Sequence, residues 1–256
     1  MTVLSDKFAA LHIPGDPVIL YNIWDAGSAV AVARAGTKAI ATGSWGVAGA
    51  LGFKDGEALP LDLALDNVDR IMSVVDLPVS IDLEAGYGAS AADVGRSIAR
   101  AAERGVAGIN IEDKDPVTRT LFETGEAAAR IAAAARTGVF VNARADLFIL
   151  TPPAEHDSAV IDAVLERARA YADAGAGGLF VPFLKDEALI ARLCERSPLP
   201  VNILFGEGLP GHARLAELGV ARISHGHGPW AAAMDWVHEQ ARQLMNNVTS
   251  KMADIR

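Results

Sequence analysis

The sequence of 256 residues is poor in several features, and each shortage excludes a class of protein. It has one cysteine, Cys194, so no disulfide can form within the chain. It has no run of about 18 apolar residues, the length that spans a bilayer. The first residues, MTVLSDKFAALH, lack the basic and apolar segments of a signal peptide. We therefore expect a cytoplasmic protein.

Positive charge is also in short supply. The chain has 23 Lys and Arg against 32 Asp and Glu, which gives a formal net charge of −9. Such a balance argues against nucleic acid or an anionic membrane as the partner. There is no G-x-G-x-x-G after the first apolar segment, so a dinucleotide-binding open sheet is not favoured either.

What the sequence does contain is a repeated alternation of strand-like and helix-like segments. Eight segments have the apolar pattern of buried strands: 18–24, 39–44, 79–84, 108–113, 139–144, 178–184, 200–206 and 221–227. The segments between them have helical spacing; 90–105, for example, has Ser90 as its expected N-cap and Gly105 at its end. Eight such pairs predict a single (β/α)8 TIM barrel over residues 1–256.

Three connections are the longest in this scheme. Residues 45–60 are the longest segment expected to lack regular structure, followed by 114–123 and 148–158. They follow the second, fourth and fifth strands, at the end of the barrel where TIM barrels hold their active sites.

The segment VSIDLEAGYG, residues 79–88, carries two carboxylates beside the apolar residues of one strand. Side chains alternate across a strand, so Asp82 and Glu84 should point into the barrel together with Ser80. The same parity directs Asn110 and Glu112 inward from the fourth strand. From the fifth and seventh strands it directs inward Asn142, Arg144 and Asn202.

Three carboxylates and one arginine should therefore converge near the top of the barrel. Buried carboxylates are costly unless a positive group lies among them. Arg144 could pair with Glu112 or Glu84 in a purely structural network. Alternatively, oxygen ligands could hold a divalent cation such as Mg²⁺, which would leave Arg144 for a substrate anion. The charge count favours the cation, and both alternatives remain open.

The motifs IDLEAGYG, INIEDK and VNARAD, with NIWDAGSA at 22–29 and GSWGVAGALGFKDGE at 43–57, resemble those of the isocitrate lyase/phosphoenolpyruvate mutase superfamily. The resemblance covers nearly the whole chain. It implies a (β/α)8 barrel that depends on Mg²⁺, or on Mn²⁺ in its place, and acts on a small oxo or hydroxy carboxylic acid.

The resemblance also implies roles for individual residues. Asp82, Glu84 and Glu112 would be metal ligands, and Asp55 would bond the metal-bound waters. Catalytic roles would fall to Arg144, Asp55 and Glu112. The substrate would be bound by Ser44, Trp45, Gly46, Arg144 and Asn202.

The loop after the fourth strand departs from the known specificities of this superfamily. It reads DKDPVTRTLFE and has neither the Cys and His of the lyases nor the Asn-Ser or Thr-Ser pair of the phosphonopyruvate enzymes. We expect a carbon–carbon lyase, and keep a phosphonopyruvate-type mutase or hydrolase as an alternative. A Schiff-base aldolase using Lys185 and an oxo-acid-binding protein without catalysis are further alternatives. His225 and His227 are weaker candidates for a metal pair or an acid–base group.

The last helix is expected at the C-terminus, with one apolar stripe suited to packing on the barrel: Trp230, Met234, Val237, Ala241, Leu244, Met245 and Val248. Trp236 falls off this stripe. Apolar residues on two sides of a helix suggest contact with another chain. The resemblance implies a last helix exchanged between paired barrels, so we expect a homo-oligomer, a dimer of dimers.

Overall fold

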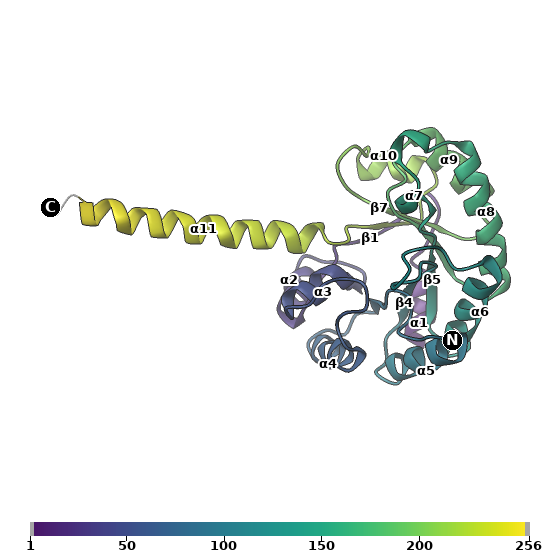
Figure 1. The fold of residues 1–256 in the computed structure, drawn as a ribbon, viewed down its shortest axis with the longest axis horizontal. Helices are drawn as coiled ribbons and strands as arrows, with labels where there is room; N and C mark the ends of the chain where they lie inside the picture. Colours follow the sequence, from purple (N-terminus) through teal and green to yellow (C-terminus); the bar gives the residue numbers. More distant parts are fainter. Residues whose placement is uncertain (1–2, 254–256) are drawn as a thin grey trace.

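The computed structural model describes residues 3–253, and side chains as far as residue 246. Its core is a sheet of eight parallel strands in the order β1-β8-β7-β6-β5-β4-β3-β2 (Figure 1). The strands are β1 (Val18–Leu20), β2 (Ile40–Ala41), β3 (Val79–Asp82), β4 (Gly108–Glu112), β5 (Phe140–Arg144), β6 (Gly178–Val181), β7 (Val201–Leu204) and β8 (Arg222–Ser224). Every strand lies within a segment predicted from the sequence.

The sheet closes into a barrel just beyond the ends of β1 and β2. Ile23 and Thr42 form a parallel bridge there. The Ile23 N–H donates to the Ala41 carbonyl at 2.8 Å, and the Gly43 N–H donates to the Ile23 carbonyl at 3.3 Å. The predicted (β/α)8 TIM barrel is therefore confirmed as one α/β domain.

Helices connect the strands around the outside of the barrel, with one further helix before the first strand and one after the last. They are α1 (Val3–Ala9), α2 (Ala26–Arg34), α3 (Ser44–Ala50), α4 (Leu61–Met72), α5 (Ala91–Ala102), α6 (Thr124–Ala135), α7 (Leu147–Leu150), the 3-10 turn η1 (Pro153–Glu155), α8 (Ser158–Asp173), α9 (Glu187–Arg196), α10 (His212–Glu217) and α11 (Gly228–Ala253). Ser90 caps α5 as predicted, since its hydroxyl accepts from the Asp93 N–H and the Asp93 carboxylate accepts from the Ser90 N–H.

Two of the segments expected to lack regular structure contain helices. Helix α3 begins at the start of 45–60, and α7 and η1 occupy part of 148–158. The sequence did not predict α3 because Gly46 and Gly49 are poor helix formers. Packing explains both glycines: a Cβ on Gly49 would approach the Trp230 ring to 2.7 Å, and one on Gly46 would approach the Trp230 Cβ to 3.1 Å.

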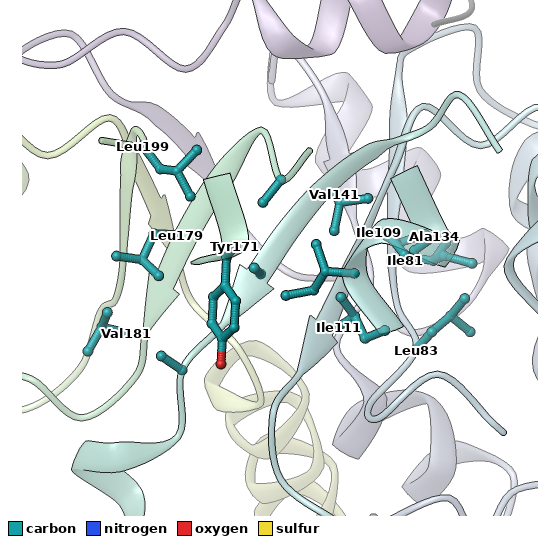
Figure 2. Close-up of a cluster of buried hydrophobic side chains, with 14 of the residues drawn as sticks. Ile81, Leu83, Ile109, Ile111, Ala134, Val141, Tyr171, Leu179, Val181 and Leu199 are labelled. Carbon is teal, nitrogen blue, oxygen red and sulfur yellow. The ribbon is translucent and has the colours of Figure 1, made fainter. Parts of the chain in front are cut away.

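The strand parity holds throughout the polar segments. Ile81, Leu83, Ile109 and Ile111 face outward and are buried beneath the helices, as Figure 2 shows. Burying these side chains contributes the largest favourable term to folding. Their neighbours of the other parity line the lumen.

The lower end of the lumen is apolar. Helix α1 places Phe8, which is fully buried, among the inward-facing residues at the start of the strands. The members of this lower cluster are Phe8, Val18, Leu20, Ala39, Ala41, Ala107 and Phe140. Side chains of this apolar cluster therefore fill the lower end of the lumen.

Helix α11 does not pack along the barrel as its apolar stripe predicted. It extends straight away from the barrel body, and Trp230 in its first turn is the part that contacts α3 (Figure 1). Trp236 is 66% exposed and Leu244 is 59% exposed. Val248 of the predicted stripe lies outside the described side chains. Within residues 3–253 no helix, including this long one, is apolar enough to cross a membrane.

Candidate active site

The end of β3 forms the centre of the site. Asp82 is held by the Thr42 hydroxyl, which accepts from its N–H at 2.9 Å, and by the Ser44 N–H, which donates to Asp82 Oδ2 at 3.2 Å. The chain then turns sharply, with Glu84 and Tyr87 at φ of 49° and 53°. Non-glycine residues rarely adopt this conformation, and functional sites are where it accumulates.

The second loop closes over this turn. The Glu57 N–H donates to Glu84 Oε2 at 2.7 Å, and the Glu57 carboxylate accepts from the Tyr87 N–H at 2.8 Å. Asp55, in the same loop, interacts with the Ser44 hydroxyl and acts electrostatically on Glu84. The loop therefore brings a further carboxylate, Asp55, to the predicted group.

The ends of β4 and β5 carry an ion-pair network. Arg144 Nη1 lies 2.8 Å from Glu112 Oε2. Its other nitrogens make a forked contact with Asp146, Nε to Oδ1 at 2.5 Å and Nη2 to Oδ2 at 2.8 Å. Lys114 Nζ lies 2.7 Å from Asp146 Oδ2 and 3.4 Å from Glu112 Oε1. The structural pairing of Arg144 with Glu112 therefore exists, and the fork of Arg144 is directed at a protein carboxylate.

Asp146 is the site residue that the sequence argument missed. It is fully buried and receives both cations of the network. Its N–H donates to Asp113 Oδ1 at 2.9 Å, and Asp113 is held in turn by the Tyr171 hydroxyl at 2.6 Å and by Arg167 at 3.1 Å. The motif VNARAD contained the signal, a carboxylate two residues after Arg144.

The carboxylates outnumber the cations even with this network. The carboxylates are Asp55, Asp82, Glu84, Glu112 and Asp146, and among the described residues their ion pairs are made with Arg144 and Lys114 alone. Burial, then the charges of Asp55 and Asp82, raises the pKa of Glu84 to about 8. Burial raises the pKa of Glu112 to about 7 although Arg144 opposes the shift. Elevated carboxylate pKa values in one cleft are typical of sites that bind a cation or transfer protons.

The donor set fits a magnesium ion held largely through water. No three His, Cys, Asp or Glu side chains among the described residues are placed to enclose a metal directly. Mg²⁺ usually retains several waters and takes only one or two carboxylates. Asp82 is partly exposed and has no cation paired with it among the described residues, whereas Glu112 is occupied by Arg144 and Lys114. Asp82 therefore fits a direct ligand best.

The chain is also similar to known proteins. A model of the phosphoenolpyruvate phosphomutase family matches residues 8–245. This chain belongs to that family. The predicted resemblance to the isocitrate lyase/phosphoenolpyruvate mutase superfamily is thereby confirmed.

Individual members of the superfamily are similar over most of their length. A Burkholderia cenocepacia J2315 protein provisionally described as a phosphonomutase is 49% identical, with a TM-score of 0.91 over 94% of this chain and 98% of its own. The uncharacterized protein Rv1998c of Mycobacterium tuberculosis (strain ATCC 25618 / H37Rv) is 38% identical over 93% of this chain and 88% of its own. The 2-methylisocitrate lyase of Salmonella typhimurium is 31% identical over 75% and 70%.

The residues expected to bind the substrate of a phosphomutase-family enzyme are not all at the centre. Ser44, Trp45 and Gly46 form the first turn of α3, where helix N–H groups have no partner within the helix. The Ser44 N–H is already bonded to Asp82, and Trp45 and Gly46 follow it. Asn202 lies in the lumen, 1% exposed, and neither its amide oxygen nor its nitrogen has a hydrogen-bond partner among the described residues.

The weaker candidates lie around the rim. The His227 ring stacks on Trp45 at 4.9 Å, while the His225 ring contacts Phe205 and His212. The two histidines thus face different neighbours and form no pair. Both line a cavity of about 210 Å³ that also includes Lys185, an exposed residue. Cys194 lies in α9, where burial raises its thiol pKa to about 12. It is therefore a packing residue.

Proposed function

We propose that this protein is a Mg²⁺-dependent lyase that cleaves a carbon–carbon bond in a small 2-oxo or 2-hydroxy carboxylic acid. The observation that carries the proposal is the excess of carboxylates around Asp82 at the open end of a phosphomutase-family barrel. One solved structure bears on the cation and one relative on the carbon–carbon bond. Phosphonopyruvate hydrolase, which shares the fold at 21% identity, was solved with oxalate and Mg²⁺. The oxaloacetate decarboxylase of Pseudomonas aeruginosa (strain LESB58) is 28% identical over 214 residues.

Each residue of the candidate active site would have its own role in this reaction. Asp82 would hold the cation directly, with Glu84, Glu112 and Asp55 contributing through water. When bound, the cation supplies stabilisation of the negative charge that the breaking bond leaves on the substrate oxygen. The first-turn N–H groups of α3, at Trp45 and Gly46, would orient the substrate carboxylate. Arg144 and Lys114, fixed by Asp146, would supply positive charge at the opposite side.

The test is a panel of C4 to C7 oxo and hydroxy acids with phosphonopyruvate included. Each acid is incubated with the protein and Mg²⁺, and release of pyruvate, glyoxylate, oxalate or phosphate is measured. The proposal expects a carbon–carbon cleavage product that Asp82→Ala and EDTA both abolish, while Asp82→Ala retains the fold by circular dichroism. No turnover of any acid would refute catalysis and leave an oxo-acid-binding protein.

A phosphorus–carbon bond is the second candidate substrate bond. It is favoured by the two cations, Arg144 and Lys114, on one side of the site, since a phosphonate carries more negative charge than a carboxylate. Phosphate release from phosphonopyruvate, with no cleavage of the other acids, would decide for this candidate.

A Schiff-base aldolase is disfavoured by the position of Lys185. That side chain is exposed at the rim, and its Nζ would lie 3.6 Å from a Cβ built on Gly208. A reactive amine is usually desolvated in an apolar pocket. Borohydride trapping with the active acid should therefore give no adduct, and an adduct lost in Lys185→Ala would reverse this conclusion.

Arg144→Lys tests the substrate side of the site. A lysine cannot reproduce the fork to Asp146 together with the contact to Glu112. We expect KM to rise by about tenfold or more. Unchanged kinetics would leave Arg144 as a structural ion-pair residue only.

We also propose that the protein is a homo-oligomer, a dimer of dimers, with α11 in the contact. The support is the exposure of Met234, Trp236, Val237 and Leu244 on a helix that leaves the barrel. Sedimentation should give a species larger than the 26.8 kDa chain. A truncation at Gly228 should then become smaller or insoluble, and a truncated chain of unchanged size class would oppose the proposal.

A further inference from the structure

Arg222 crosses the lumen of the barrel. It is fully buried on β8, where its Nε donates to Ser224 Oγ at 3.0 Å. Its Nη2 donates to Asn110 Oδ1, on β4, at 3.2 Å. Strands β8 and β4 lie opposite each other, because three strands separate them in each direction around the barrel. The guanidinium group therefore lies in the middle of the lumen.

This guanidinium has no carboxylate beside it. The other deeply placed arginines do: Arg130 pairs with Glu126, Arg144 with Asp146 and Glu112, and Arg167 with Asp113. Among the described residues no carboxylate comes within 4.0 Å of Arg222. An unpaired buried charge is expensive, and arginine does not escape it by losing its proton at neutral pH. Its charge must be balanced from further away.

The nearest source of negative charge is the carboxylate site above it. Asn110, which accepts from Arg222, is the register partner of Asp82 on the neighbouring strand, and both face the lumen. Burial lowers the pKa of Arg222 to about 9, and the charge of Asp82 opposes that shift. Arg222 is thus the positive charge beneath a site that otherwise has five carboxylates and two cations.

The layer around the guanidinium is polar and incompletely bonded. Arg222 Nη1, Asn142 Oδ1, Ser80 Oγ and both amide atoms of Asn202 are buried without a partner among the described residues. Asn202 is the register partner of Arg222 on β7. The side chains of Ser80, Asn142 and Asn202 are uncharged, so none of them neutralises the guanidinium, and its field reaches the carboxylates above.

We propose that Arg222 is a positioning residue of the carboxylate site, which fixes Asn110 beside Asp82 and supplies the counter-charge to the site from below. Its charge weakens the attraction for a divalent cation and strengthens the attraction for an anionic substrate. The proposal rests on the proposed function, because the cation and the acid are those of the proposed reaction.

The test is whether removing the charge of Arg222 changes the affinity for a cation and the affinity for an anion in opposite directions. In the full-length protein, Mn²⁺ affinity is measured by titration calorimetry, and oxalate affinity is then measured at saturating Mn²⁺. Arg222→Met should bind Mn²⁺ about tenfold more tightly and oxalate about tenfold more weakly, the size expected for one charge at short range in a protein. Arg222→Lys, the matched control that keeps the charge, should change each by less than about threefold. If the Met variant does not fold, Arg222→Gln gives the same comparison.

A damaged structure would weaken both ligands together, so parallel losses, or no change in either, overturn the proposal. A double-mutant cycle measured in EDTA tests the proposed coupling between Arg222 and Asp82 without metal. Asp82→Asn and Arg222→Met should shift the urea midpoint non-additively, and additive shifts overturn the proposal. Wild-type protein that binds no Mn²⁺ would refute the proposed function, and the EDTA cycle would still decide the role of Arg222.

Discussion

The two ends of the barrel lumen are built on the same strands with opposite chemistry. Strand β5 shows the change within five residues: inward-facing Phe140 belongs to the lower apolar cluster, Asn142 lies in the middle, and Arg144 lies in the upper ion-pair network. The inward-facing row of strand β3 likewise changes from a neutral residue, Ser80, to a charged one, Asp82, toward the upper end. Position along an inward-facing row therefore decides whether a residue packs or reacts.

The lower end of the lumen contributes to the stability of the fold, whereas the upper end carries the charged groups of the candidate active site. The lower cluster and the outer layer bury apolar surface, which favours folding. The upper site buries carboxylates that repel one another, as the raised pKa values of Glu84 and Glu112 indicate. Excess charge of this kind lowers stability until a ligand neutralises it. Changes at the two ends should consequently affect different measurements.

The largest effect is expected from Asp146→Ala at the upper end. This change removes the closer of the two carboxylates that Arg144 and Lys114 share, Glu112 being the other, and breaking a buried ion pair costs about 3–5 kcal/mol. The activity found with the substrate panel should fall by about a thousandfold, because both cations lose their positions. Urea unfolding and steady-state kinetics measure the two effects. Activity within about tenfold of wild type would show that Asp146 does not hold the site.

Phe8→Ala should act mainly on stability, because removing the Phe8 ring, whose centroid lies 5.8 Å from Arg222 Cζ, leaves the Arg222 charge in place. The Phe8 ring is fully buried and meets Phe140 edge-on at 5.4 Å, so its removal leaves a cavity that costs about 3–5 kcal/mol. Mn²⁺ affinity at a temperature where the variant is folded should stay at the wild-type value. A change in metal affinity as large as that of a carboxylate variant would show that the two ends are not independent.

Parity and strand spacing predicted the barrel, its eight strands and the inward group that contains Asp82, Glu84, Glu112 and Arg144. Asp146 escaped because it lies past the end of β5, where alternation no longer assigns a side. Arg222 faces inward by the same parity, but its reach across to β4 depends on barrel closure. The course of α11 was not predictable from its stripe, because the apolar pattern does not say which surface it covers.

The pH dependence of stability should differ with and without a cation. The folded pKa of Glu84 is about 8 against its usual 4.5, because burial and the charges of Asp55 and Asp82 disfavour ionisation. Between those values the folded protein keeps a proton that the unfolded chain has lost. Stability without metal should therefore fall as pH rises from about 5 to 8, by on the order of 1–3 kcal/mol. Urea unfolding in EDTA measures this.

Glu84→Gln is the control for that profile. A neutral side chain in place of Glu84 should flatten the decline, and saturating Mg²⁺ should flatten it in the wild type. If Glu84→Gln declines as steeply as the wild type, the dependence arises elsewhere, and Glu112, whose pKa is raised to about 7, is the next group to replace.

The smallest effect is expected from Tyr87→Phe, which removes a long hydrogen bond to one of the upper carboxylates. The Tyr87 hydroxyl lies 3.4 Å from Glu84 Oε1, too far for a strong bond, and the loss should be below about 1 kcal/mol. Tyr171→Phe is the matched change behind the site, where the hydroxyl donates to buried Asp113 at 2.6 Å and the loss should be about 1.5–3 kcal/mol. Free energies of unfolding in urea compare the two. We expect the Tyr87 hydroxyl to hold Glu84 less firmly than the Tyr171 hydroxyl holds Asp113, because Glu84 must be able to move when a cation binds. Equal losses in the two variants would contradict this expectation.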